Sequence, residues 1–308
     1  MRTMGCWLTA ILLSTAPLGA QQRDDAGYDT SVARPLFPPG AGPRVAVDGG
    51  HHNFHTIGGR YRVFGGVLEA DGFRVSQIDE PFSSRSLSGV DILVIANPGT
   101  DSVSSWDLPT HSAFDPEEIA AVVAWVRAGG ALFLIADHMP AAGAAAALAK
   151  PFGARFTNGY TLDPTRELPR GDLFRRADGR LLDHPITRGR DERERIDSVF
   201  TFTGQAFQTD DGFEILLRFG PDAYTLLPTR AGRGFDSTTA RVSSAGWTHA
   251  AVRSFGRGRV ALVGEAAMFS AQLAGPSAAP MGMNYPPARQ NKQLLLNLMH
   301  WLAGRLTP

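Results

Sequence analysis

Cysteine is almost absent from this sequence: Cys6 is the only one among 308 residues. One cysteine cannot close an intramolecular disulfide, and Cys6 lies in an N-terminal segment that we expect to be removed. The mature chain is therefore predicted to have no disulfide, no thiolate metal site and no cysteine nucleophile.

An excess of charge of one sign is also missing, because Lys+Arg and Asp+Glu both number 30. A neutral balance gives no electrostatic reason to expect nucleic acid or an anionic membrane surface as the partner. The balance favours a small-molecule or neutral ligand, such as a carbohydrate. It leaves open whether copies of the chain associate as a homo-oligomer.

Long apolar runs are missing too. The N-terminal run over residues 6–13 follows Arg2 and is shorter than the roughly 20 residues that a membrane-spanning helix needs. It indicates a signal peptide over residues 1–20, cleaved near Ala20, and hence an exported protein, periplasmic or extracellular, with no transmembrane segment after cleavage. Residues 21–42, rich in proline and glycine near their end, indicate a flexible leader.

From residue 43 to residue 306 the sequence alternates short apolar runs with helical patterns, which is typical of an α/β domain with a mostly parallel central sheet. Between about residues 151 and 248 the pattern loosens into an inserted, partly antiparallel middle region or sheet extension. The predicted strands are 45–48, 73–78, 91–96, 131–136, 213–219, 223–227 and 259–264, and the predicted helices are 61–70, 116–128, 141–149, 266–270 and 289–302.

Polar side chains follow several of the predicted strands. Asp48 and Asn53 follow the first, Asn97 the third, Asp137 the fourth and Glu265 the last. The carboxyl ends of parallel strands meet at one edge of a sheet, where ligands bind in open α/β folds. We therefore expect these residues to form one rim.

Three histidines stand in five residues after the first strand: His51, His52 and His55. Imidazoles on a glycine-flanked loop can act as a general base or bind a divalent metal, and His51, His55 and Asp137 are the candidate metal ligands. The alternative is that they bond backbone groups without touching a ligand. No HExxH pattern supports zinc.

Asp137 and His138 occupy the turn after the fourth strand, where α/β hydrolases present a nucleophile. Asp137 could act as a base, orient a histidine or cap the next helix. Glu265 could join it or cap its own helix. Asn284 and Arg289, ahead of the last helix, could reach the same rim as ligand-binding groups.

The chain resembles the class I glutamine-amidotransferase-like superfamily, especially an uncharacterised bacterial branch near trehalose-utilisation-type and gliding-transporter-accessory domains. The resemblance rests on the first-strand motif 45–48 with residues 51–56, on Asp183–Gly189 and on Gly256–Glu265. It implies a flavodoxin-like three-layer sandwich. Amidotransferases place a cysteine where this chain has Asp137, so the resemblance does not extend to a glutaminase.

Two functional hypotheses remain. In the first, the histidines and the carboxylates Asp137 and Glu265 activate water in a hydrolase that acts on a small polar or carbohydrate-like substrate. In the second, the domain is a non-catalytic periplasmic binding or accessory module for carbohydrate or protein partners. The first requires the polar residues to share one water-accessible pocket, and the second is favoured if they are bonded into helix caps.

Overall fold

The structure is a computed structural model that describes residues 22–100, 108–165, 168, 171–230 and 235–306. The predicted signal peptide, residues 1–20, lies outside the described residues. Within them, no helix is long and apolar enough to cross a membrane.

A nine-stranded sheet forms the centre of the molecule, in the order β3-β2-β4-β5-β15-β14-β10-β6, with β11 also paired to β14. The first five strands of this order are parallel and the others are antiparallel. The α/β class is confirmed, but the sheet is mixed. Its strands are β2 (Arg44–Asp48), β3 (Arg74–Ile78), β4 (Ile92–Ala96), β5 (Ala131–Ile135), β6 (Ala154–Phe156), β10 (Phe207–Thr209), β11 (Glu214–Arg218), β14 (Thr248–Phe255) and β15 (Gly258–Val263).

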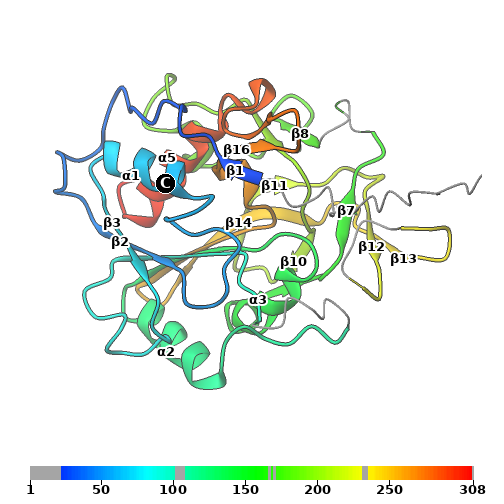
Figure 1. Cartoon of the computed structure of the whole chain (residues 1–308), viewed down its shortest axis with the longest axis horizontal. Helices are drawn as coiled ribbons and strands as arrows, with labels where there is room; N and C mark the ends of the chain where they lie inside the picture. The colour runs from blue at the N-terminus through cyan, green and yellow to red at the C-terminus, as the bar shows by residue number, and fades with distance from the viewer. Residues whose placement is uncertain (1–21, 101–107, 166–167, 169–170, 231–234, 307–308) are drawn as a thin grey trace, which may run out of the picture.

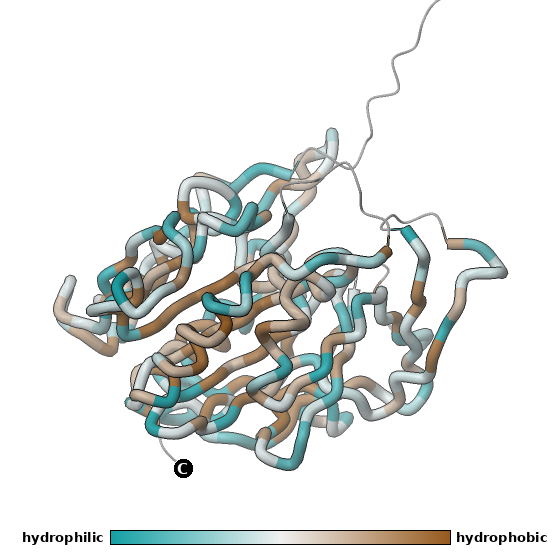
Figure 2. Tube along the Cα trace, turned by 90° about the horizontal axis from the view of Figure 1, so that it is seen from below, coloured by the Kyte–Doolittle hydropathy of each residue, from teal (hydrophilic) through white to brown (hydrophobic). Residues whose placement is uncertain are grey.

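Helices cover both faces of this sheet (Figure 1). Val45 and Val47 of β2 share a core with α1 and α5, whereas Ala46 shares the other core with α2 and α3. This alternation follows from the two-residue period of a strand. Figure 2 shows the hydrophobic residues gathered along the central strands. The helices are α1 (Arg62–Ala70), α2 (Pro116–Arg127), α3 (Ala141–Ala149), α4 (Pro185–Arg188) and α5 (Asn291–Leu302).

Helix α2 begins where the sequence predicts. Asp115 is its N-cap, Pro116 is its first residue, and the carboxylate of Glu118 accepts the Asp115 N–H at 3.0 Å. Gly129, with φ +122°, follows the helix and turns the chain into β5.

The middle region, residues 151–248, extends the central sheet and adds smaller ones (Figure 1). It supplies β6, β10 and β11 to the nine-stranded sheet, and the predicted strands 213–219 and 223–227 correspond to β11 and β12. Its other strands are β7 (Tyr160–Leu162), β12 (Tyr224–Leu227) and β13 (Ala240–Ser243) in one sheet, and β8 (Asp172–Arg175) and β9 (Ser198–Thr201) in another.

The predicted flexible leader, residues 21–42, is packed onto the domain where the structure describes it. Strand β1 (Gln22–Asp24) pairs antiparallel with β16 (Ala271–Ala274), which pairs in turn with β17 (Ala279–Gly282). Further along, the Lys292 ammonium of α5 donates to the carbonyl oxygens of Asp29 and Ser31 at 2.9 and 2.6 Å.

Two predicted helices differ from the structure. Residues 266–270 contain only one 3₁₀ turn, η2 (Ala267–Phe269), because the chain then continues into β16. The last helix begins at Asn291, since a separate 3₁₀ turn, η3 (Pro286–Ala288), precedes it; a third such turn, η1 (Lys150–Phe152), follows α3.

Candidate functional site

The predicted rim lies at the carboxyl ends of β2, β4, β5 and β15, which are neighbours in the sheet. Its polar residues form two groups. We call them the His51 group, which contains Asp48, His51 and Glu118, and the Asp137 group, which contains His55, Asn97, Asp137 and Glu265.

His51 is held between two carboxylates. Its Nδ1 bonds Asp48 at 2.9 Å to Oδ1 and 3.0 Å to Oδ2, and its Nε2 bonds Glu118 Oε1 at 2.9 Å. The rings of Phe82 and Phe114 pack against it, with centroids 4.6 and 4.7 Å away. Since both ring nitrogens face carboxylate oxygens, both are donors when the ring is protonated.

The electrostatics of this group favour the charged histidine. Burial by itself lowers the pKa of His51, but the hydrogen bonds and charges of Asp48 and Glu118 outweigh it and raise that pKa. Burial tends to raise the pKa of Glu118, yet the N–H groups of Asp115 and Phe82 and the His51 ring lower it overall. The His51 group is thus an internal ion triad whose donors and acceptors are already used.

Asn53 completes the His51 group from the side. Its Nδ2 donates to Asp48 Oδ2 at 3.0 Å and to the Ala96 carbonyl oxygen at 3.4 Å. Its own Oδ1 accepts the His51 N–H at 3.1 Å. These bonds fix the loop after β2 to the end of β4.

Asn97 and Asp137 bond each other reciprocally. Asn97 Nδ2 donates to Asp137 Oδ2 at 2.6 Å, and the Asp137 N–H donates to Asn97 Oδ1 at 2.8 Å. The other carboxylate oxygen of Asp137 accepts the Ala266 N–H at 2.6 Å. Asn97 holds a φ of +48°, a conformation that asparagine tolerates better than most residues. Asp137 therefore ties together the ends of β4, β5 and β15.

His55 lies behind this pair. Its ring is 1% exposed and packs on Tyr61, with centroids 4.8 Å apart, while Asn97 Nδ2 lies 3.4 Å from its Nδ1. Burial, with a smaller effect from the charge of Arg60, lowers the pKa of His55 to about 3. His55 is thus a neutral, buried imidazole at ordinary pH.

Glu265 is also buried, 1% exposed. Its carboxylate accepts the N–H groups of Ala267 at 2.6 Å and Met268 at 2.9 Å, and so caps η2. Burial raises the pKa of Glu265 well above the ordinary value, and the nearby charge of Asp137 adds to this, against the opposing effect of the backbone donors.

The remaining predicted residues lie apart from these groups or at their margin. His138 is partly exposed and stacks on Tyr160, with centroids 4.2 Å apart, and His52 is exposed. Asn284 donates to Asp25 and to the Gln272 carbonyl oxygen, and so holds the leader against β16. Arg289 is exposed, and among the described residues no hydrogen bond or ion pair joins it to either group.

The predicted metal ligands are not gathered. Among the residues that the structure describes, no three His, Cys, Asp or Glu side chains are arranged to hold a metal ion. His51 belongs to one group, and His55 and Asp137 to the other.

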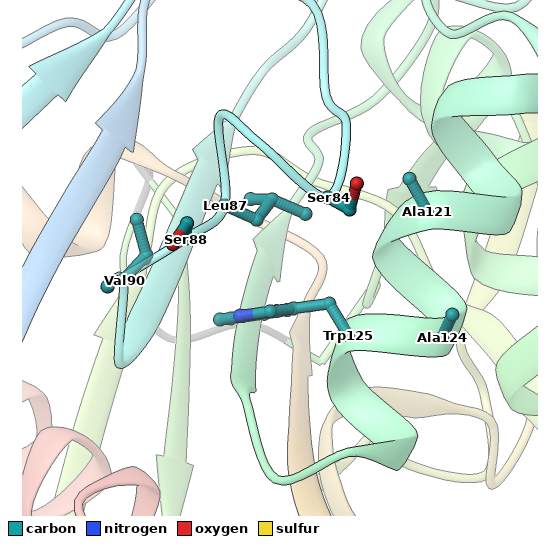
Figure 3. A pocket seen from close by; sticks show the side chains of 8 residues that line it. Ser84, Leu87, Ser88, Val90, Ala121, Ala124 and Trp125 are labelled. Carbon is teal, nitrogen blue, oxygen red and sulfur yellow. The ribbon is translucent and has the colours of Figure 1, made fainter.

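Two surface hollows lie away from the predicted site residues, none of which lines them. One, of about 430 Å³, lies between α2 and the loop before β4, where the Trp125 ring extends from α2 toward Leu87 and Ser88 (Figure 3). The other lies at the opposite ends of the strands, next to Pro43, Asp91 and Gly130.

The sequence did not identify Glu118 or Gln272 as site residues. Glu118 was placed only in the cap of α2, and its bond to His51 spans 67 positions, which no local pattern reveals. Gln272 lies on the unpredicted strand β16, fully buried, with its Nε2 3.5 Å from His55 Nε2.

No protein-family profile matches the chain, and no curated protein matches it. Among solved structures, the N-terminal domain of mmIFT52 is similar to it over 84% of this chain and 97% of that domain, with a TM-score of 0.58 and 13% identity. Two thua-like proteins, from Bacteroides uniformis ATCC 8492 and Parabacteroides merdae ATCC 43184, are similar with TM-scores of 0.46. They are 12% and 13% identical, and the alignments cover 85% and 87% of this chain and 92% of each of theirs.

Proposed function

We propose that the protein is a non-catalytic binding domain whose ligand contacts the partly exposed rim around Phe54, Asp137 and His138. One observation carries this: the ionisable groups expected for catalysis bond one another or the backbone. His51 lies between two carboxylates, His55 is neutral and buried, and Glu265 caps η2.

Membership of the class I glutamine-amidotransferase-like superfamily, with a flavodoxin-like three-layer sandwich, is part of the proposal. The five parallel strands lie in the order β3-β2-β4-β5-β15. If they are renumbered 1 to 5 along the chain, this order is 2-1-3-4-5, which is the flavodoxin-like order. Export to the periplasm or the outside of the cell remains a proposal that rests on the N-terminal sequence.

A carbohydrate is the ligand class that suits this rim. Phe54 is 48% exposed, and the partly exposed His138, stacked on the buried Tyr160, adds a second ring. Aromatic faces beside amide and carboxylate groups can pack on sugar C–H groups and accept hydroxyl hydrogen bonds.

Calorimetric titration with a panel of saccharides tests the proposal. We expect at least one saccharide to bind, with no hydrolysis product, and Phe54→Ala to weaken binding several-fold. Leu108→Ala is the matched control, because Leu108 is also a half-exposed apolar residue, 50% exposed. A complete lack of saccharide binding, or equal weakening by both variants, would contradict the proposal.

A hydrolase is the second candidate, and the pairing of Asp137 with Glu265 favours it. Two nearby carboxylates, one with a raised pKa, provide an acid and a base in many hydrolases. A hydrolysis screen with Asp137→Asn, Glu265→Gln, His51→Ala and His55→Ala tests this alternative. Turnover by the wild type that Asp137→Asn or Glu265→Gln removes would establish it and would overturn the binding-only proposal.

A further inference from the structure

Arg60 lies at the rim, next to Tyr61, the N-cap of α1. Its guanidinium stacks over the Phe54 ring, with Cζ 3.7 Å from the centroid, and its Nη1 donates to the Phe54 carbonyl oxygen at 3.2 Å. Its Nε is buried without a hydrogen-bond partner. Within the described residues, no carboxylate forms an ion pair with Arg60, whereas the next arginine, Arg62, pairs with Asp24 at 3.4 Å.

Burial alone lowers the pKa of Arg60, and no neighbouring acid offsets this effect. A partly buried cation without a counter-ion loses hydration and gains no ion pair in return. A bound anion would supply the missing partner. Guanidinium also suits this role because it stacks on an aromatic face while its second terminal nitrogen, Nη2, can still donate to an oxyanion.

The surroundings of Arg60 also favour an anion. Helix α1 has no side-chain cap at Tyr61 and no acidic residue in its first turn, so the positive end of its dipole is not neutralised from within. Asp24 of the leader forms its ion pair with Arg62, at 3.4 Å. His55, on the other side, is neutral and does not compete for an anion.

We propose that Arg60 binds the oxyanion of a sugar ligand, a carboxylate or a phosphate, while the exposed part of Phe54 packs on the sugar ring. This inference rests on the proposed binding function and narrows its ligand class to acidic saccharides. The loop after β2 then serves as the specificity element of the rim, because Phe54 and Arg60 both belong to it.

The test uses the whole mature chain and calorimetric titration with digalacturonate, glucose 6-phosphate, inorganic phosphate and the neutral sugars galactobiose and glucose. We expect one of the acidic sugars to bind about tenfold more tightly than its neutral counterpart, as a charged hydrogen-bonded pair provides. Arg60→Gln is expected to remove that preference while leaving neutral-sugar binding within about twofold.

Arg62→Gln is the matched control, since it removes one positive charge two residues away, and it is expected to preserve the preference. The titrations with digalacturonate and glucose 6-phosphate show whether a carboxylate or a phosphate is bound. A preference for either of these sugars that Arg60→Gln removes supports the inference. If acidic and neutral sugars bound equally well, and Arg60→Gln left both affinities unchanged, the role of Arg60 would be overturned while the proposed binding function would stand. A lack of binding by every sugar would overturn both, and inorganic phosphate bound without any sugar preference would overturn the sugar assignment.

Discussion

His51 shows how a residue with catalytic chemistry can serve the fold. Its ring separates the carboxylates of Asp48 and Glu118, both buried. Replacing it by asparagine leaves two buried negative charges facing one another without a cation between them. We expect His51→Asn to lower the free energy of unfolding by about 3 kcal/mol, the cost typical of removing one partner from a buried ion pair. Urea denaturation measures this, with the exposed His52→Asn as control, which should change it by less than about 0.5 kcal/mol.

The same triad predicts a pH dependence. The raised pKa of His51 gives a stabilisation that is complete below its ordinary value of 6.5 and is lost as the pH rises through the folded-state value. The lowered pKa of Glu118 gives a second stabilisation, which is complete above the ordinary pKa of 4.5 and is lost as the pH falls through the folded-state pKa. The stability difference between wild type and His51→Asn should therefore be largest between pH 4.5 and 6.5. A difference that grows steadily above pH 7 would contradict the ion triad.

Asn97 combines a positive φ with the amide that bonds Asp137. Asn97→Gly removes the amide but keeps the backbone free to adopt φ +48°, whereas Asn97→Ala also adds the steric cost of a Cβ in that region. We expect both variants to be less stable than the wild type, and the alanine variant to be lower than the glycine variant by about 1 kcal/mol. Thermal unfolding of the three proteins measures this. Equal stability of the two variants would show that the backbone is not strained here.

At the scale of elements, the sequence predicted the regular part of the fold best. The cap of α2 and the strands β2, β4, β5 and β15 carry local signals, namely Asp115-Pro116 and short apolar runs bounded by turns. The sequence does not predict β16 and β17: they pair with each other as a local hairpin, and β16 also pairs with β1, which lies far away in the sequence. The polar residues predicted to follow the strands do lie at the strand ends, but their division into two groups depends on contacts such as His51–Glu118, which tertiary packing alone creates.

Strand β1 protects the edge of β16, since Gln22 pairs with Ala274 and Asp24 with Gln272. Deleting residues 21–25 from the mature chain should expose the amides of β16 that face β1, and hydrogen exchange should report faster exchange there. Strand β15, inside the central sheet, should keep its protection and serves as the internal control. Unchanged protection of β16 would show that the leader contributes nothing to this edge.

At the scale of the molecule, the described residues of the middle region share their hydrophobic clusters with residues from the rest of the chain. Phe174 of β8 belongs to the same cluster as Phe64 of α1, and Phe156 of β6 belongs to the cluster that contains Leu148 of α3. Both clusters also contain residues of the central strands, because alternate residues of each strand face opposite sides of the sheet. We infer from this shared packing that the inserted region extends the same folding unit.

This shared packing predicts one cooperative unfolding transition. Phe64→Ala, in the parallel half, and Phe174→Ala, in the middle region, should each destabilise the whole molecule by about 3–5 kcal/mol, because each leaves a cavity in the same core. Far-UV circular dichroism and tryptophan fluorescence should then shift together in both variants; among the described residues the fluorescence reports on Trp125 of α2, Trp247 beside β14 and Trp301 of α5. Phe54→Ala, at an exposed ring, should leave the midpoint nearly unchanged. If Phe174→Ala shifted only part of the signal, the middle region would have to unfold independently, and the rim would then rest on the parallel half alone.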